Sequence, residues 1–294
     1  MFSILLGFVM AQDLPDINTP PIVNGEATDR FIQAGALMYY SEQYGGASFC
    51  SGTLVHKHWV VTAAHCIEAM DEYASYGMSM IFVLGDSLYA QDDIYTYDEI
   101  EAWYMHPEYN AQRLQHDIGV LELTNGITSV DPISLSTETP SSNWSGQEVI
   151  YVGWGVTGDN RNDSGRKRWA SISYQDMDDQ FIYSLDESGQ KNLCSGDSGG
   201  PALRLQYDGT YKLVGVNSFV FGYYQNALCY GGGSGATRID SNYEWLMDYI
   251  PAPESEFDAE NAPKVACASA QAQDMLMTLS VFGLLLIGRR RQTS

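Results

Sequence analysis

A serine held between glycines is the residue of this chain best suited to act as a nucleophile. Ser198 lies in the run Cys194–Pro201, which reads Cys-Ser-Gly-Asp-Ser-Gly-Gly-Pro. Glycine lets the main chain turn tightly and aim its N–H groups at a substrate oxygen. Two further motifs could supply a general base and a carboxylate that orients it: His65 in Val-Thr-Ala-Ala-His-Cys, and Asp117 in Asp-Ile-Gly-Val-Leu. Such a set can activate a serine hydroxyl for attack on a carbonyl carbon.

The three motifs, in the order His65, Asp117 and Ser198, resemble those of the trypsin/chymotrypsin-like serine proteases. The resemblance covers about residues 22–250. It implies an all-β fold of two orthogonally packed six-stranded antiparallel β-barrels with a C-terminal helix, and an active site between the barrels. It also implies a serine-type endopeptidase that forms an acyl-enzyme and needs no cofactor or metal. His65 would act as base and then acid, while Asp117 would hold the ring.

Coarse patterns along the chain agree with this fold. We expect barrel one at about residues 22–140 and barrel two at about 141–250. The apolar runs 149–152 and 213–216 are typical of strands. In the run 242–250, a helix would place four apolar side chains on one face: Tyr243, Leu246, Met247 and Ile250.

The resemblance also implies roles for residues around the triad. The backbone N–H groups of Gly196 and Ser198 would form an oxyanion hole. Cleavage before Ile22 would free an α-ammonium that pairs with Asp197. Pro21 stands where the family usually has Arg or Lys, so a trypsin-like activator should not cut there. Another activating protease, stepwise trimming and a permanent zymogen all remain open.

The implied disulfides join Cys50 to Cys66 and Cys194 to Cys229. These pairings leave Cys267 over, and five cysteines in a chain of this size indicate an oxidising compartment.

The substrate pocket departs from that of trypsin. Asn192 occupies the pocket base, where cleavage after Lys or Arg would need an aspartate. Ser218 and Phe219 match the segment that binds substrate backbone, but Val220 follows where glycine is common. A β-branched residue there would narrow the entrance. We therefore predict a neutral P1 residue of small or medium size, and no trypsin-like specificity.

Charge and histidine placement exclude several other functions. The chain has 15 Lys and Arg against 37 Asp and Glu, a formal charge of −22, which argues against nucleic acid and anionic surfaces as main partners. The other histidines show no metal-ligand spacing, and we expect them to be surface or packing residues: His56, His58, His106 and His116. His116 precedes Asp117, and neighbours along a strand point in opposite directions.

Both ends of the chain are typical of targeting segments. We expect a signal peptide at 1–11 and a propeptide at 12–21, then the protease domain at 22–250. An acidic linker at 251–266 would lead to a hydrophobic tail at 267–294, whose apolar run ends in three arginines. The tail resembles the sorting tails of bacterial surface proteins, and a permanent anchor is the alternative. We expect a monomer that is secreted or surface-associated through a bacterial envelope, and a sorting enzyme that processes the tail.

Two other functions fit the same motifs. The fold could serve as a catalytically silent surface binding module, with Pro21 blocking activation and Val220 filling the cleft. An esterase could use the same triad on non-peptide substrates. The intact triad and the family resemblance favour a protease that acts on proteins or peptides.

Overall fold

The computed structural model describes residues 22–43, 45–222 and 229–252. The predicted signal peptide, propeptide and C-terminal tail lie outside these ranges, as does the predicted linker beyond Ala252. Within the described ranges, no helix has the length and apolar character needed to cross a membrane.

Barrel one is a closed antiparallel sheet in the order β2-β3-β4-β7-β6-β5. Its strands are β2 (Ala34–Ser41), β3 (Gly45–His56), β4 (Trp59–Thr62), β5 (Ser79–Gly85), β6 (Ile94–Met105) and β7 (Gly119–Leu123). Apolar side chains from all sides fill the interior, with Leu37, Leu54, Phe82 and Leu121 fully buried. A Cβ at Gly35 would clash with the Phe82 ring, so the glycine makes room for this core residue.

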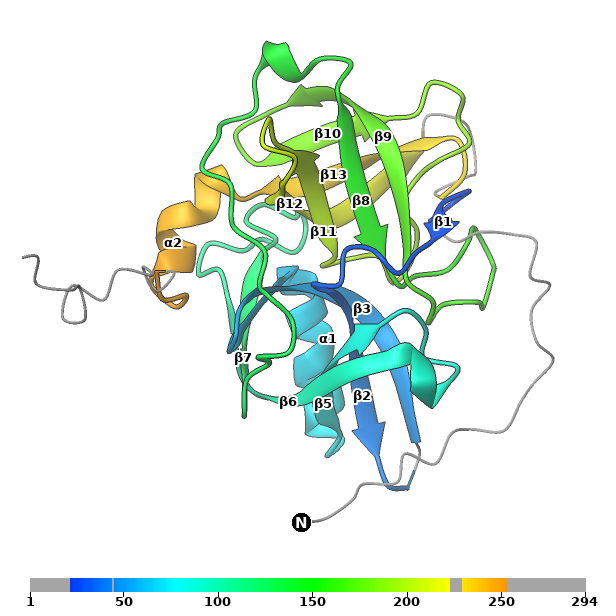
Figure 1. Ribbon diagram of the computed structural model, residues 1–294, viewed down its shortest axis with the longest axis vertical. Helices are drawn as coiled ribbons and strands as arrows, with labels where there is room; N and C mark the ends of the chain where they lie inside the picture. The colour runs from blue at the N-terminus through cyan, green and yellow to red at the C-terminus, as the bar shows by residue number, and fades with distance from the viewer. Residues whose placement is uncertain (1–21, 44, 223–228, 253–294) are drawn as a thin grey trace, which may run out of the picture. The chain divides into compact units, whose positions relative to one another are not determined.

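Barrel two closes in the order β8-β9-β10-β13-β12-β11, because β8 pairs with both β11 and β9. Its strands are β8 (Glu148–Gly153), β9 (Arg168–Met177), β10 (Phe181–Leu185), β11 (Pro201–Leu205), β12 (Tyr211–Gly222) and β13 (Gly232–Arg238). The predicted strands at 149–152 and 213–216 fall within β8 and β12. Figure 1 shows this barrel in green to yellow above barrel one in blue to cyan.

The first described residues belong to barrel two, whereas we expected them in barrel one. The short strand β1 (Glu26–Ala27) pairs with Trp169 and Arg168 of β9, and in Figure 1 it lies beside the green strands. Ile22 is fully buried in the barrel-two core. The sequence order was misleading because a two-residue strand has no pattern that identifies its partner.

Helices are few. The described residues contain α1 (Ala64–Ser75) and α2 (Tyr243–Met247), with 3₁₀ turns η1 (Gln91–Asp93), η2 (Ser142–Trp144) and η3 (Asp240–Asn242). The predicted C-terminal helix is therefore present but shorter than expected, with Leu246 and Ile250 buried. The all-β fold with two six-stranded antiparallel barrels is confirmed.

Candidate active site

His65 and Asp117 form a doubly hydrogen-bonded pair in barrel one. The Nδ1 of His65 lies 2.8 Å from Asp117 Oδ2, and the His65 backbone N–H donates to Asp117 Oδ1 over 2.9 Å. The carboxylate is fully buried, while 26% of the imidazole remains exposed. Because a carboxylate accepts hydrogen bonds, Nδ1 is the donor, and Nε2 of the neutral ring keeps a lone pair that can take a proton.

Strand pairing brings these two residues together. Thr62, at the end of β4, pairs with Gly119 at the start of β7, so the segments that follow and precede these residues meet at one end of the barrel. A Cβ at Gly119 would clash with Ile67 of α1, and glycine thus allows β7 to approach the helix that carries His65. The disulfide between Cys50 and Cys66 ties the first turn of α1 to β3.

Ser198 reaches the same place from barrel two. Its carbonyl oxygen accepts a hydrogen bond from the Ser51 N–H over 2.8 Å and lies 3.6 Å from Cys66 Sγ. These contacts fix the Ser198 loop against the residue that follows His65. Among the hydrogen bonds of the described residues, none joins the Ser198 hydroxyl to His65. In unliganded sites such bonds are often long and tighten when substrate binds.

The loop before Ser198 takes a shape that requires glycine. Gly196 has a φ of +94°, in the region that side chains disfavour, and a Cβ there would lie 2.8 Å from Gly155 Cα. Ser51 supports this loop through its hydroxyl, which donates to the Gly196 carbonyl over 2.9 Å and accepts from the Trp154 N–H over 3.1 Å. The positive φ sets the direction of the Gly196 peptide, and the hydrogen bond from Ser51 holds that peptide in place.

Asp197 is a buried carboxylate with few partners. It accepts hydrogen bonds from the backbone N–H of Gly155 over 2.9 Å and of Cys194 over 2.8 Å. Burial raises its pKa to about 7, although these two N–H donors and Arg168 favour the charged form. Ile22 is buried in the same barrel, and Val23 forms an isolated bridge with Asn192, two residues before Cys194.

A pocket of about 150 Å³ opens beside Ser198. Its lining includes the predicted residues Ser218, Phe219 and Val220, together with Leu193, Cys194, Ser195 and Asn217. None of these described lining residues is charged. Asn192 is buried and accepts a hydrogen bond from the Ser234 hydroxyl over 2.5 Å. A larger groove of about 730 Å³ lies near Phe31 and Tyr211 and contains no triad residue.

The described residues contain two disulfides, with the pairings that the resemblance implied. Cys50 joins Cys66, and Cys194 joins Cys229. The second bond tethers the segment before Ser198 to the residues that precede β13. Each disulfide therefore holds one part of the site, the first in barrel one and the second in barrel two.

Some contacts at the site could not be foreseen from the sequence. The Ser218 hydroxyl donates to Asp117 Oδ2 over 2.5 Å, across 101 positions of chain, although Ser218 was expected only to bind substrate. His106 and His116 were expected to be surface or packing residues, and their rings stack with centroids 4.4 Å apart. His116 also lies in a turn rather than a strand, with a φ of +51°, so the argument that it points away from Asp117 does not hold.

The two closed six-stranded barrels define a protein of the chymotrypsin-like fold. Residues 22–246 match the family described as Trypsin, and the chain belongs to this family.

Curated relatives are similar at a distance. Vitamin K-dependent protein C of Rattus norvegicus is 28% identical over an alignment of 255 residues, which covers 79% of this chain and 52% of that protein. Chymotrypsin-like elastase family member 1 of Rattus norvegicus is 28% identical over an alignment of 238 residues, which covers 74% of this chain and 85% of that protein. Chymotrypsin of Phaedon cochleariae is 28% identical over an alignment of 214 residues, which covers 68% of this chain and 71% of that protein. The chain thus spans about half the length of protein C and most of the elastase.

Proposed function

We propose that this protein is a serine endopeptidase in which Ser198 is the nucleophile, His65 the general base and Asp117 the residue that orients it. The observation that carries the proposal is the double hydrogen bond between His65 and Asp117 next to the anchored Ser198 loop. The pair holds the imidazole in one tautomer, with its free nitrogen available to the serine hydroxyl. Membership of the trypsin family supports the same activity.

The reaction proceeds in two halves. His65 Nε2 takes the proton from the Ser198 hydroxyl as the oxygen attacks the peptide carbonyl carbon. The proton then passes to the leaving amine, the C–N bond breaks, and an acyl-enzyme ester remains on Ser198. Water attacks that ester by the same route, and His65 returns the proton to the serine oxygen. Asp117 stays ionised and stabilises the imidazolium.

Backbone N–H groups of Gly196 and Ser198 would stabilise the oxyanion. The positive φ of Gly196 and the support of its carbonyl by Ser51 favour a fixed orientation of this peptide. Donors that are already oriented cost no reorganisation during the reaction, and the loss of one such donor costs about 3–4 kcal/mol of barrier.

Activation would follow cleavage before Ile22. The buried Asp197 accepts only backbone donors among the described groups that hydrogen-bond to it, and it would gain an ion pair with a new α-ammonium. A buried carboxylate is costly without a cationic partner. The activating protease must accept Pro21 before the cut, or reach Ile22 by trimming.

The pocket favours a neutral P1 residue. Its described lining has no carboxylate to pair with Lys or Arg, and Val220 contributes to its wall. A volume of about 150 Å³ suits a small or medium side chain. Substrates are therefore proteins or peptides cut after such residues.

The two disulfides support export to an oxidising compartment. The protein would be secreted, and its C-terminal tail would be processed or anchored at a bacterial envelope. It would act as a monomer.

Peptide hydrolysis by two serine variants tests the proposed function. In protein that begins at Ile22, Ser198→Ala should lower kcat by about 10⁶-fold, because it removes the nucleophile. Ser145→Ala is a matched control, since this exposed serine of barrel two does not line the pocket beside Ser198 and should retain full kcat. Equal activity of both variants would contradict the role of Ser198. Folded wild-type protein with no hydrolysis of a P1-diverse peptide library would favour the silent binding module.

A further inference from the structure

The turn that leads to Asp117 has a backbone shape that its own residues do not favour. Leu114 has a φ of +53° and His116 a φ of +51°, both in the left-handed region that residues with a side chain rarely adopt. Such conformations persist where surrounding contacts hold them in place. His116 directly precedes the carboxylate that binds His65. The contacts of His116 therefore bear on the geometry of the triad.

Barrel two supplies contacts that hold His116. The His116 backbone N–H donates to the Gln180 side-chain oxygen, Oε1, over 2.9 Å and across 64 positions of chain. Because a backbone N–H only donates, this bond fixes the orientation of the Gln180 amide, whose Nε2 lies 3.4 Å from His116 Nε2. The other ring nitrogen, Nδ1, lies 3.1 Å from the Asn242 side-chain oxygen, Oδ1. Both ring nitrogens and the backbone of His116 thus face amides of barrel two.

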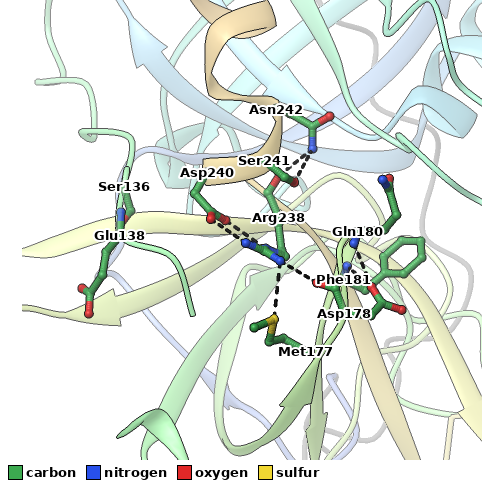
Figure 2. A network of polar contacts seen from close by, with 10 residues as sticks. All are labelled: Ser136, Glu138, Met177, Asp178, Gln180, Phe181, Arg238, Asp240, Ser241 and Asn242. Atoms are coloured by element: carbon green, nitrogen blue, oxygen red, sulfur yellow. Dashed lines mark hydrogen bonds and ion pairs between the residues drawn. The ribbon is translucent and has the colours of Figure 1, made fainter. Parts of the chain in front are cut away.

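The two amides agree on one tautomer of the neutral His116 ring. The Asn242 amide nitrogen donates to the Arg238 carbonyl over 2.7 Å and to the Ser241 hydroxyl over 3.2 Å (Figure 2). Its oxygen is therefore the atom that faces His116, and it accepts from Nδ1–H. The lone pair of Nε2 then faces the amide N–H of Gln180.

Gln180 is itself fixed in the turn between β9 and β10. Its backbone N–H donates to Asp178 Oδ1 over 2.8 Å, and its carbonyl accepts from the Arg238 N–H over 2.9 Å. The Arg238 guanidinium donates to the Asp178 carbonyl over 2.5 Å and pairs with both carboxylate oxygens of Asp240, at 3.0 and 2.6 Å. Figure 2 shows the guanidinium between these two residues. One network thus holds the turn of Gln180 and the η3 segment that carries Asn242.

The path from His116 to His65 is short. The Ile118 N–H donates to the His116 carbonyl over 2.8 Å, and the His106 N–H donates to the Ile118 carbonyl over 3.0 Å. Asp117 lies between His116 and Ile118, so a shift of the His116 peptide changes the position of its carboxylate. That carboxylate accepts two hydrogen bonds from His65, over 2.8 and 2.9 Å, and a small displacement would lengthen both.

We propose that Gln180 is a positioning residue of the active site, which holds the His116 turn and thereby sets the Asp117 carboxylate against His65. The inference rests on the triad proposed above. Gln180 acts through His116 and not on the reacting atoms. Barrel two then contributes to both halves of the site, because it carries Ser198 and also helps to orient the base of barrel one.

Kinetics of two Gln180 variants test the proposal in protein that begins at Ile22. Gln180→Met keeps the length of the side chain but removes both polar atoms. It should lower kcat by about tenfold with little change in KM. The acidic limb of the kcat/KM profile, which reports His65 in the free enzyme, should move to lower pH, because a displaced carboxylate stabilises the imidazolium less. Gln180→Glu keeps an oxygen that can accept from the same N–H, and it should recover most of kcat.

Gln33→Met is the matched control. Gln33 is also half-buried, and its side-chain amide donates to the backbone carbonyl of Asp131 over 2.9 Å. This exchange should leave kcat and the pH profile unchanged. The midpoint of thermal unfolding measures separately what each exchange costs in stability. Gln180→Ala takes the place of Gln180→Met should the latter not fold.

Proton NMR gives a readout that does not depend on hydrolysis. The proton shared between His65 Nδ1 and Asp117 should give a downfield resonance in the wild type and in Gln180→Glu. In Gln180→Met this resonance should move upfield or broaden. Wild-type protein that cuts no peptide, with a resonance that changes only in Gln180→Met, would contradict the proposed protease activity and support the role of Gln180.

Three results would overturn the proposal. The first is Gln180→Met with the kcat, the pH profile and the resonance of the wild type. The second is the same loss of kcat in Gln33→Met as in Gln180→Met. The third is a loss in Gln180→Glu as large as that in Gln180→Met, because the oxygen that accepts from His116 would then not be the atom that matters.

Discussion

In barrel one, His65 and Asp117 hold each other directly, through a backbone and a side-chain hydrogen bond to one buried carboxylate. In barrel two, Ser198 depends on a loop whose shape rests on Gly196 at positive φ and on the buried Asp197. The proposed base and its partner thus contact each other directly within barrel one. The proposed nucleophile is held by backbone contacts and by a carboxylate whose printed hydrogen bonds, among the described residues, come from backbone N–H groups alone. Activation should therefore act on barrel two.

Of the three effects that compare the barrels, the largest should follow a change in barrel one that leaves the fold intact. Asp117→Asn should lower kcat by about 10⁴-fold, because the amide permits the wrong tautomer of His65. Steady-state peptide hydrolysis measures this. Asp98→Asn makes the same exchange at a buried carboxylate of barrel one that binds Asn125 and Gly126. Asp98→Asn should reduce stability with little change in kcat. A loss of kcat equal to that of Asp117→Asn would mean that the loss of any buried carboxylate in barrel one, and not the orientation of His65, lowers activity.

A smaller effect should appear in the pH dependence of barrel two. In protein that retains Pro21, burial raises the native pKa of Asp197 to about 7, above the ordinary value of 3.8 for an aspartate. The native state therefore binds this proton more tightly than the unfolded state. The resulting stability is complete below about pH 4 and is lost as the pH rises through about 7, by at most about 4 kcal/mol.

Urea unfolding from pH 4 to pH 8 measures this loss. Asp197→Asn should remove the dependence in the Pro21 form. Protein that begins at Ile22 should show a weaker one, because the proposed α-ammonium would stabilise the charged carboxylate. The same slope in all three proteins would show that Asp197 does not govern barrel two.

The smallest of the three effects concerns the loop glycine. Gly196→Ala should lower kcat by about 10²–10³-fold, since a Cβ near Gly155 would displace one oxyanion donor. Gly209→Ala is matched in φ, at +85°, but its Cβ would meet nothing within 4 Å. It should cost about 1 kcal/mol of stability through strain alone and leave kcat unchanged. An equal loss of activity in both would mean that backbone strain, not the position of the donor, matters.

Sequence motifs predicted the fold and the contact between His65 and Asp117 because each motif is local and distinctive. The run around Ser198 needs glycine at fixed offsets, and two of its glycines, Gly196 and Gly199, are seen at positive φ. Contacts between distant segments were not predictable. Ser218 reaches Asp117 across 101 positions, and no short pattern encodes that approach.

The cluster of His106 and His116 was missed for a related reason. A spacing of ten residues fits neither a helix nor a strand repeat. A turn with left-handed residues at Leu114 and His116 brings the rings together. Non-glycine residues in that conformation are uncommon, so composition gave no signal for it. The partner of β1 was missed because two residues carry too little pattern.

Covalent labelling with a fluorophosphonate tests the central claim most directly. Three proteins are compared after peptide mapping by mass spectrometry: the form that begins at Ile22, its Ser198→Ala variant, and the form that retains Pro21. We predict that the first is labelled rapidly and only at Ser198, the second not at all, and the third much more slowly. Labelling at another residue, or none in folded protein that begins at Ile22, would contradict a serine endopeptidase whose nucleophile is Ser198.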